Sequence, residues 1–151
     1  MSEAGTVIAI HLAAVESGPV HAVDSVEAVA GAGLRGDRYF EPGAKPVEQL
    51  TLIESEELER LAADAGIELA PGESRRQLTT RGVRLNPLVG RRFRVGEVEC
   101  LGIELCEPCS HLQKLTGREG LMRAFAHKAG LNAEILTGGE IAVGSPIELL
   151  D

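Results

Sequence analysis

Residues 101–117 read Leu-Gly-Ile-Glu-Leu-Cys-Glu-Pro-Cys-Ser-His-Leu-Gln-Lys-Leu-Thr-Gly, and this stretch passes from a strand pattern into a group of reactive side chains. Apolar residues at 101, 103 and 105 alternate with Gly102 and Glu104, which is the period of a half-buried strand. We expect that strand to cover 98–105. Pro108 lacks the N–H that a strand ladder uses, so the strand should end near Cys106. Cys109 would then lie on a turn, where a rigid scaffold presents side chains for chemistry.

The sequence on both sides of this stretch holds many short strand patterns separated by turn signals. We expect these strands at 6–12, 25–29, 47–53, 76–80, 92–95, 131–136, 140–143 and 146–150. Gly138-Gly139 predicts a hairpin between the strands at 131–136 and 140–143, and the last strand is expected at a sheet edge.

Two helix patterns accompany the strands. Apolar residues form one stripe over 55–65, and a capping box at 116–119 predicts a second helix over about 117–128. Strands that are short and numerous, with only two helices, favour a mainly β fold of the β-barrel type over a parallel α/β sheet.

Composition restricts the class of protein. The chain has 151 residues, 44% of them hydrophobic, and we expect a single domain over 1–151. A net charge of −8 argues against a nucleic-acid partner, because binding phosphates takes clustered basic residues. No apolar run approaches the ~18 residues of a membrane span, and no secretory signal is evident, so we expect a cytoplasmic protein with reduced thiols and no membrane partner.

The positive charge is concentrated in one segment. Residues 75–94 contain seven arginines and no acidic residue, within an otherwise acidic chain. Such a segment suggests a small anionic ligand, and Arg75, Arg76 and Arg81 are our candidates for binding it. The alternative is that these arginines pair with surplus carboxylates across strands. Asp37, in the glycine-rich loop 31–38, is a further candidate for orienting a ligand or an arginine.

Three chemistries fit Cys106-Glu-Pro-Cys109: a redox dithiol, a zinc site that adds His111 as a third ligand, and a single reactive thiolate at Cys109. The thiolate makes the fewest demands on the sequence. Cys106 could resolve a persulfide on Cys109 by forming a disulfide. A protonated His111 would lower the pKa of Cys109 and Glu107 would raise it, so the sequence leaves the net direction open. Cys100 lies within a strand pattern and is expected to be buried.

Eight segments together resemble the MOSC domain family, which is named for the C-terminal domain of molybdenum cofactor sulfurase. The segments are 34–39, 49–54, 75–83, 88–90, 93–96, 107–109, 130–139 and 143–146. The resemblance implies a β-barrel-like fold and one functional cysteine, which falls on Cys109. The family's arginine-containing strand falls on residues 75–81, although Gln77 stands where many relatives have asparagine.

The resemblance implies three functions. In the first, Cys109 carries sulfur as a persulfide, with Cys106 and His111 beside it. A pyridoxal-phosphate cysteine desulfurase would donate the sulfur, and molybdopterin or a metal–sulfur centre would accept it; pyridoxal phosphate would belong to that partner only. In the second, the chain is a molybdenum-cofactor oxidoreductase acting on N-hydroxylated compounds, with Cys109 as the metal ligand. In the third, it is a cofactor-binding module with inert cysteines. Asp37, Arg75, Arg76 and Arg81 are the candidate cofactor-binding residues in each case.

Overall fold

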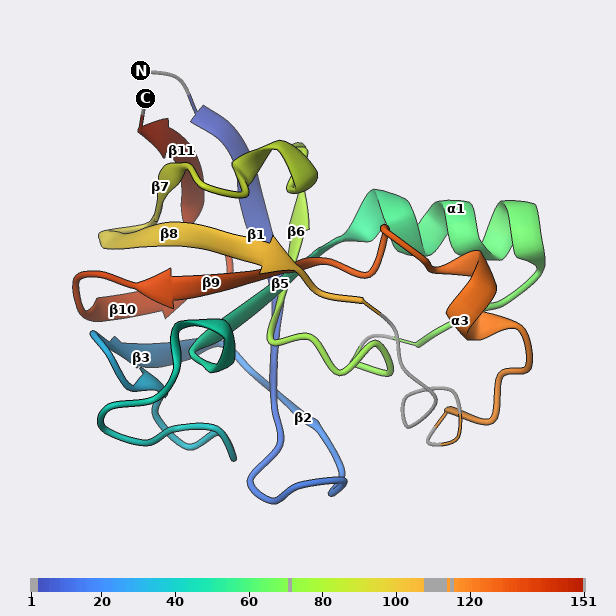
Figure 1. The fold of residues 1–151 in the computed structure, drawn as a ribbon, viewed down its shortest axis with the longest axis horizontal. Helices are drawn as coiled ribbons and strands as arrows, with labels where there is room; N and C mark the ends of the chain where they lie inside the picture. Colours follow the sequence, from blue (N-terminus) through green and yellow to red (C-terminus); the bar gives the residue numbers. More distant parts are fainter. Residues whose placement is uncertain (1–2, 71, 108–113, 115, 151) are drawn as a thin grey trace.

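A closed β-barrel forms the body of the molecule in the computed structural model, which describes residues 3–70, 72–107, 114 and 116–150 (Figure 1). Within these residues, seven strands follow one another around the barrel in the order β11-β7-β8-β9-β5-β6-β1, and a pairing of β11 with β1 closes the ring. Their bounds are β1 Glu3–Leu12, β5 Leu50–Glu54, β6 Leu78–Arg81, β7 Arg92–Val95, β8 Val98–Leu105, β9 Leu131–Ile135 and β11 Pro146–Leu150. All ring pairings are antiparallel except β5 with β6. The mainly β, barrel-type fold expected from the sequence is therefore confirmed.

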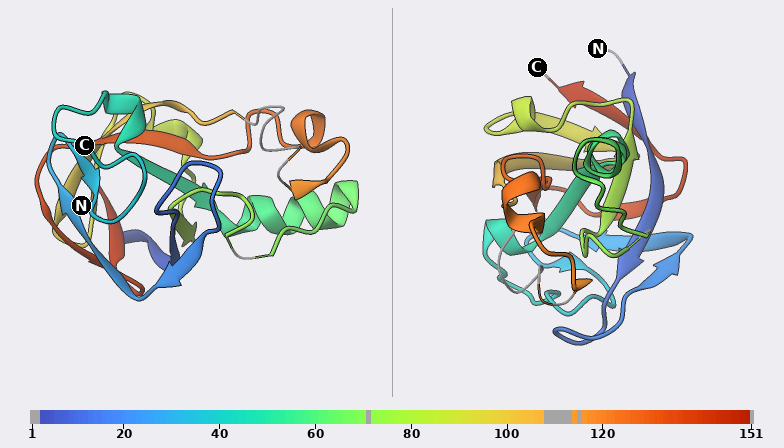
Figure 2. Two further views of the ribbon diagram at one scale, coloured as in Figure 1. Left: turned by 90° about the horizontal axis from the view of Figure 1, so that it is seen from below. Right: turned by 90° about the vertical axis from the view of Figure 1, so that its right-hand side faces the viewer.

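Four further strands and the short helices lie outside the barrel among the described residues. Strand β2 (His21–Val23) extends the sheet from β1, and a separate small sheet has the order β10-β3-β4. These strands are β3 Ser25–Val29, β4 Gly33–Leu34 and β10 Gly139–Ala142, and the 3₁₀ helices are η1 Pro46–Glu48 and η2 Asn86–Leu88. Helices α1 (Ser55–Ala65) and α3 (Leu121–Ala124) lie beside each other at one end of the molecule in both figures (Figure 2).

Two apolar clusters stabilise this arrangement. The larger fills the barrel and includes Leu52, Phe93 and Leu131, each with no exposed surface. The smaller joins the helices to the barrel through Ile53, Leu61, Leu121, Phe125 and Ala129. Burying a large aliphatic or aromatic side chain contributes roughly 1.5–3 kcal/mol, so the smaller cluster stabilises the packing of the helical end against β5.

Helix α1 has the predicted bounds, and Gly66 ends it with a left-handed φ of 68°. The second helix is much shorter than the predicted 117–128. Gly120, with a φ of 80°, immediately precedes Leu121, and His127 has a φ of 61°, so the backbone is non-helical on both sides. The expected capping box is also wrong, since Thr116 Oγ1 accepts from the Arg118 N–H at 3.4 Å and α3 has no side-chain cap.

The predicted hairpin at Gly138-Gly139 is wrong. Strand β9 pairs with β8 on one edge and β5 on the other, so both of its edges are occupied when the chain reaches β10. Strand β10 therefore pairs with β3 in the small sheet. The last strand, β11, is not at a sheet edge either, because it pairs with both β7 and β1 and closes the barrel.

Smaller differences concern strand bounds. The predicted strand 47–53 begins only at Leu50, because Pro46 starts the 3₁₀ helix η1. The strand expected at 76–80 covers Leu78–Arg81. This shift leaves Arg76 and Gln77 in the segment that approaches β6. No helix among the described residues has the length and apolar character needed to cross a membrane.

Candidate functional site

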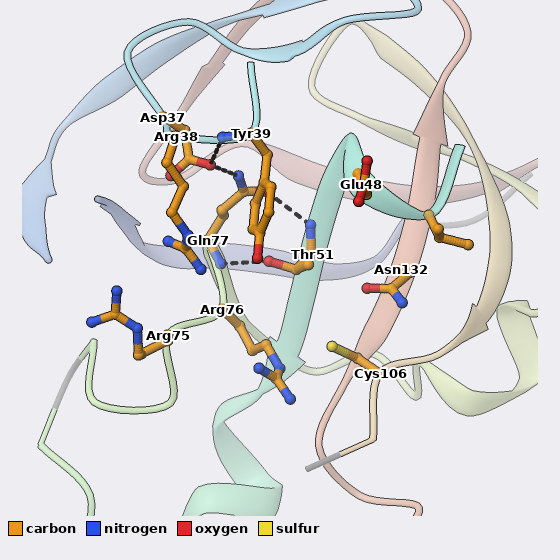
Figure 3. Close-up of a pocket in the computed structure, with 11 residues that line it drawn as sticks. Asp37, Arg38, Tyr39, Glu48, Thr51, Arg75, Arg76, Gln77, Cys106 and Asn132 are labelled. Atoms are coloured by element: carbon orange, nitrogen blue, oxygen red, sulfur yellow. Dashed lines mark hydrogen bonds between the residues drawn. The ribbon is translucent and has the colours of Figure 1, made fainter. Parts of the chain in front are cut away.

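A cavity of about 220 Å³ lies at one end of the barrel, where strand ends and loops meet (Figure 3). Five parts of the chain form its wall: the loop after β4, helix η1 with the start of β5, the segment before β6, the end of β8, and β9. The lining residues are Asp37, Arg38, Tyr39, Val47, Glu48, Thr51, Arg75, Arg76, Gln77, Cys106 and Asn132. The structure thus brings together four residues singled out from the sequence, namely Asp37, Arg75, Arg76 and Cys106.

Asp37 fixes the loop that carries Arg38. Its carboxylate is buried and accepts three hydrogen bonds: Oδ1 from the Ala13 N–H at 3.1 Å, and Oδ2 from the Tyr39 N–H at 3.3 Å and Gln77 Nε2 at 2.8 Å. Charge-assisted bonds of this kind are among the stronger ones in proteins. Asp37 is engaged by protein donors, and its role in the site is to position the loop.

Gln77 continues the same network to strand β5. Its Oε1 accepts from the Thr51 N–H at 2.9 Å, and its own N–H donates to Thr51 Oγ1 at 2.8 Å. Its carbonyl accepts from the His11 N–H at 2.8 Å. The loop after β4, the start of β5 and the segment before β6 are therefore held together by one buried polar network. This network sets the positions of Arg38, Arg75 and Arg76.

Three guanidinium groups on the cavity wall have donors with no acceptor in the part of the chain that the structure describes. Arg38 Nε, Arg75 Nη2 and Arg76 Nη2 are buried and have no hydrogen-bond partner among the described residues. The Arg76 side chain is nevertheless held in place, because its Nε donates to the Ala129 carbonyl at 2.8 Å. Buried donors without acceptors are costly, and more so when they are charged. An anion in the cavity would satisfy these donors and their charges together.

Arg75 is the most constrained of the three. Its φ of 62° is left-handed, which is unfavourable for a residue with a Cβ. Burial lowers the pKa of Arg75, the positive charge of Arg38 lowers it further, and Tyr39 and Asp37 oppose this shift. Two like charges held close together inside a protein repel each other, so a bound anion would stabilise the arrangement. Strain and repulsion concentrated at one residue are typical of a binding site.

The other arginines of the basic segment do not line this cavity. Arg81 Nη1 donates to Ser55 Oγ and to Glu59 Oε2, both at 2.9 Å. Arg92 pairs with Glu99, and Arg94 with Glu148, across neighbouring strands. Arg81, Arg92 and Arg94 thus pair with carboxylates, as the alternative interpretation of the segment expected. Arg75 and Arg76 line the cavity, and an anionic ligand for them stays a prediction.

The cysteines differ in their surroundings. Cys100 is fully buried in the barrel core, and burial raises the pKa of its thiol to about 12. Cys106 is half-buried at the end of β8 and lines the cavity, and its N–H donates to the Gly130 carbonyl at 2.8 Å. Cys109 and His111 lie outside the described residues. Within the residues that are described, no three histidine, cysteine or acidic side chains gather as a metal site would require.

Glu107, next to Cys106, is tied to the turn after α3. Its carboxylate accepts from the His127 N–H at 2.8 Å and lies 2.8 Å from His127 Nδ1. These contacts lower the pKa of Glu107, first through the backbone hydrogen bond and then through the imidazole. The chain is therefore anchored on the protein surface directly after Cys106.

Sequence reasoning missed several residues of the wall. Arg38 was passed over although it follows Asp37 directly, and its guanidinium stacks on the Tyr39 ring at 4.4 Å. Glu48, Thr51 and Asn132 belong to η1, β5 and β9. Thr51 and Asn132 lie in two of the segments that carry the family resemblance, 49–54 and 130–139, but their place in the wall depends on how the barrel brings these elements together.

The chain resembles several solved structures and one family model. The YuaD protein from Bacillus subtilis superposes with a TM-score of 0.81 at 17% identity, over 96% of this chain and 94% of that one. YiiM from Geobacillus stearothermophilus gives 0.75 at 18% identity, over 97% and 75% of the two chains. YiiM from Escherichia coli gives 0.70 at 20%, over 100% and 70%. No curated protein matches the sequence.

At these identities the solved structures show a shared fold. The family comparison is more specific, because the MOSC domain model matches residues 40–148. That range holds most of the cavity wall, from Val47 and Glu48 to Asn132. It also includes all three cysteines. The chain belongs to the MOSC domain family, which is associated with molybdenum cofactor sulfurase-like proteins and with molybdenum cofactor binding in general.

Proposed function

We propose that this protein is a sulfur carrier that accepts sulfane sulfur as a persulfide on Cys109. An anionic group of the sulfur acceptor would bind in the cavity lined by Arg38, Arg75 and Arg76, the arginine cavity. One observation carries the proposal: Arg38, Arg75 and Arg76 present buried donors without described acceptors on a single cavity. Cys106 lies on the same wall, three positions before Cys109 in the sequence. A charged pocket beside a cysteine segment suits the transfer of sulfur to or from an anionic molecule.

The donor chemistry of the cavity fits the phosphate of molybdopterin. Arginine guanidiniums bind phosphate oxygens through charge-assisted hydrogen bonds, each contributing roughly 1.5–3 kcal/mol. The volume of about 220 Å³ is below the ~300–1,000 Å³ typical of sites that enclose a drug-sized ligand. The cavity would therefore hold one end of a large ligand. Arg38, Arg75 and Arg76 would hold the phosphate, and the bound cofactor would supply a metal centre able to exchange sulfur ligands.

We propose a cysteine desulfurase as the sulfur donor. In that scheme pyridoxal phosphate stays with the desulfurase, and this chain contributes only the accepting thiolate. Attack of the Cys109 thiolate on the donor's persulfide would move one sulfur atom and leave the donor cysteine reduced. The family association with molybdenum cofactor sulfurase-like proteins supports this choice of donor.

The test is a sulfur-loading experiment on the purified protein. Incubation with a cysteine desulfurase and cysteine should add the mass of one sulfur atom, and a thiol reductant should remove it. Cys109→Ser should not load, whereas Cys100→Ser should load normally. Loading of Cys109→Ser would contradict the proposal. Stoichiometric molybdenum bound to protein from a cofactor-producing host, lost in Cys109→Ser and without any sulfur loading, would instead favour a molybdenum-cofactor oxidoreductase in which Cys109 is the metal ligand.

A further inference from the structure

A second thiol, that of Cys106, faces the arginine cavity. Cys106 lines the cavity together with Arg75 and Arg76, and Figure 3 shows its sulfur directed toward the side that carries Arg76. Cys106 is half-buried, in contrast to the fully buried Cys100. The wall that offers anion-binding donors therefore also offers a nucleophile.

A phosphate group would bind the guanidiniums but would not react with the thiol, because a phosphate has no sulfur atom that a thiolate could attack. An oxyanion that carries a sulfane sulfur would use all of it. Its oxygens would accept from the three guanidiniums, and its outer sulfur would meet the thiol. The cavity of about 220 Å³ is suited to an anion of this small size.

We propose that the cavity binds small oxyanions with a sulfane sulfur, of the thiosulfate class, and that Cys106 accepts this sulfur. This inference rests on the proposed sulfur-carrier function and names a second, small-molecule sulfur source for the same site. Arg38, Arg75 and Arg76 bind the oxyanion, and Cys106 is the residue that reacts.

The reaction needs no external oxidant or reductant. The Cys106 thiol first gives its proton to water. The thiolate then attacks the outer sulfur of thiosulfate, so that a new sulfur–sulfur bond forms on Cys106 while the sulfur–sulfur bond of thiosulfate breaks. Sulfite leaves with the electron pair of that bond. The charge is −3 before and after the step, because a thiolate and a dianion become a persulfide anion and a sulfite dianion.

The guanidiniums assist at two points. Positive charge near a thiol favours the thiolate, which is the nucleophile. The same groups interact with the oxygens on which charge grows as sulfite departs, and donors already in place for that charge lower the barrier. Asn132 and Tyr39, which also line the cavity, add polar groups on either side of it.

The experiment compares two sulfur sources on the same set of variants. The full chain is incubated either with thiosulfate or with a cysteine desulfurase and cysteine. Intact mass then reports sulfur loading, peptide mapping locates it, and released sulfite is measured in the thiosulfate arm. We expect thiosulfate to load Cys106 and release sulfite in equal amount. Cys106→Ser and Cys106→Ala should abolish this, and Cys109→Ser should keep it.

Arginine variants test the cavity itself. Arg76→Ala should lower the rate of thiosulfate loading roughly tenfold or more, as expected for the loss of one charge-assisted contact. Arg92→Ala is the matched control, because Arg92 pairs with Glu99 on the barrel surface and should leave the rate unchanged. Sulfate should compete with thiosulfate. Circular dichroism and thermal unfolding show whether each variant is folded.

The outcomes distinguish thiosulfate loading of Cys106 from desulfurase loading of Cys109. No thiosulfate loading in the folded wild type, or loading that persists without Cys106, overturns this inference whatever the desulfurase arm gives. Rates that are equal in Arg76→Ala and Arg92→Ala overturn it as well. Failure of the desulfurase arm alone counts against the proposed donor for Cys109 and leaves the Cys106 reaction standing.

Discussion

Asp37 and Gln77 lie 40 positions apart in the sequence and are joined by a hydrogen bond of 2.8 Å from Gln77 Nε2 to Asp37 Oδ2. Both side chains are buried. Through this bond, the loop that carries Arg38 is fastened to the segment that carries Arg75 and Arg76. The positions of these arginines on the cavity wall therefore depend on a carboxylate that is itself hydrogen-bonded to protein donors.

Replacing Asp37 should destabilise the protein. In Asp37→Ala, the N–H groups of Ala13 and Tyr39 and the amide of Gln77 lose their acceptor. Because an unsatisfied buried donor costs about 1–3 kcal/mol, we expect the free energy of unfolding to fall by roughly 2–4 kcal/mol. Urea denaturation measures it. Glu41→Ala, an exposed carboxylate in the same loop, is the control and should change stability by less than ~0.5 kcal/mol. Equal effects in the two variants would contradict this role of Asp37.

Arg75 should show a conflict between stability and binding. Its left-handed φ of 62° suits glycine better than any residue with a Cβ. Arg75→Gly and Arg75→Ala both remove the guanidinium, so both should lose sulfate binding measured by calorimetry. We expect Arg75→Gly to be more stable than Arg75→Ala by about 1 kcal/mol, because only glycine relieves the backbone strain. If the alanine variant were the more stable one, Arg75 would not be strained in solution.

His11 should make the fold sensitive to mild acid. Its side chain is buried, its Nδ1 has no partner among the described residues, and burial, followed by the like charge of His21, lowers the pKa of His11 below 6.5. Below pH 6.5 the unfolded chain therefore binds more protons here than the folded protein does. The His11 contribution to stability is complete above pH 6.5 and is lost as the pH falls toward the folded-state pKa.

Unfolding free energies measured between pH 5 and 8 test whether stability falls with decreasing pH as expected. In His11→Gln, the decrease in stability on acidification should be smaller than in the wild type. His21→Gln on the paired strand β2 should also reduce this decrease, but by less than His11→Gln, because His21 is only the second cause of the lowered His11 pKa. Should acidification affect His11→Gln as strongly as the wild type, another group must be responsible.

Gly130 should tolerate no side chain. It precedes β9, has a φ of 112°, and a Cβ there would lie 2.1 Å from the Leu52 carbonyl oxygen on β5. We expect Gly130→Ala to cost about 3 kcal/mol or more, because backbone atoms of the barrel would have to move. Gly43→Ala separates the clash from the dihedral, since Gly43 also has a positive φ but has open space around it. It should cost only about 1 kcal/mol. Similar unfolding midpoints for the two variants would contradict the close approach.

Sequence patterns predicted those helices and strands well that depend only on neighbouring residues. Strand β8 and helix α1 have the predicted bounds. The apolar alternation of β8, and the apolar stripe of α1 with glycine after its last residue, can both be recognised in consecutive residues. The hairpin at Gly138-Gly139 failed because pairing depends on which strand edges are still available. Strand β9 already has β5 and β8 as neighbours. Only the closed barrel determines that, and no local stretch of sequence records it.

The site was predictable in composition but not in geometry. An acid-free run of arginines includes residues 75 and 76, which line the cavity, but nothing in the run distinguishes them from Arg81, which pairs with Glu59. The difference arises because Arg75 and Arg76 lie before β6 and Arg81 at its far end. Arg38 joins them only through the buried contact of Asp37 with Gln77.

The three cysteines should differ in reactivity toward a small alkylating reagent. Cys100 has no exposed surface, and burial raises the pKa of its thiol to about 12, so at pH 8 it has almost no thiolate and no access to reagent. Cys106 is half-buried on the cavity wall. We expect native protein to label at Cys109 first and at Cys106 next, with Cys100 labelled only in denaturant.

Sulfate should slow the labelling of Cys106 in the wild type and have no such effect in Arg76→Ala. Mass spectrometry of peptides taken at successive times measures all three rates. Labelling of Cys100 in the native protein as fast as Cys106, or Cys106 labelling that sulfate leaves unchanged, would show that the thiol does not share the anion site.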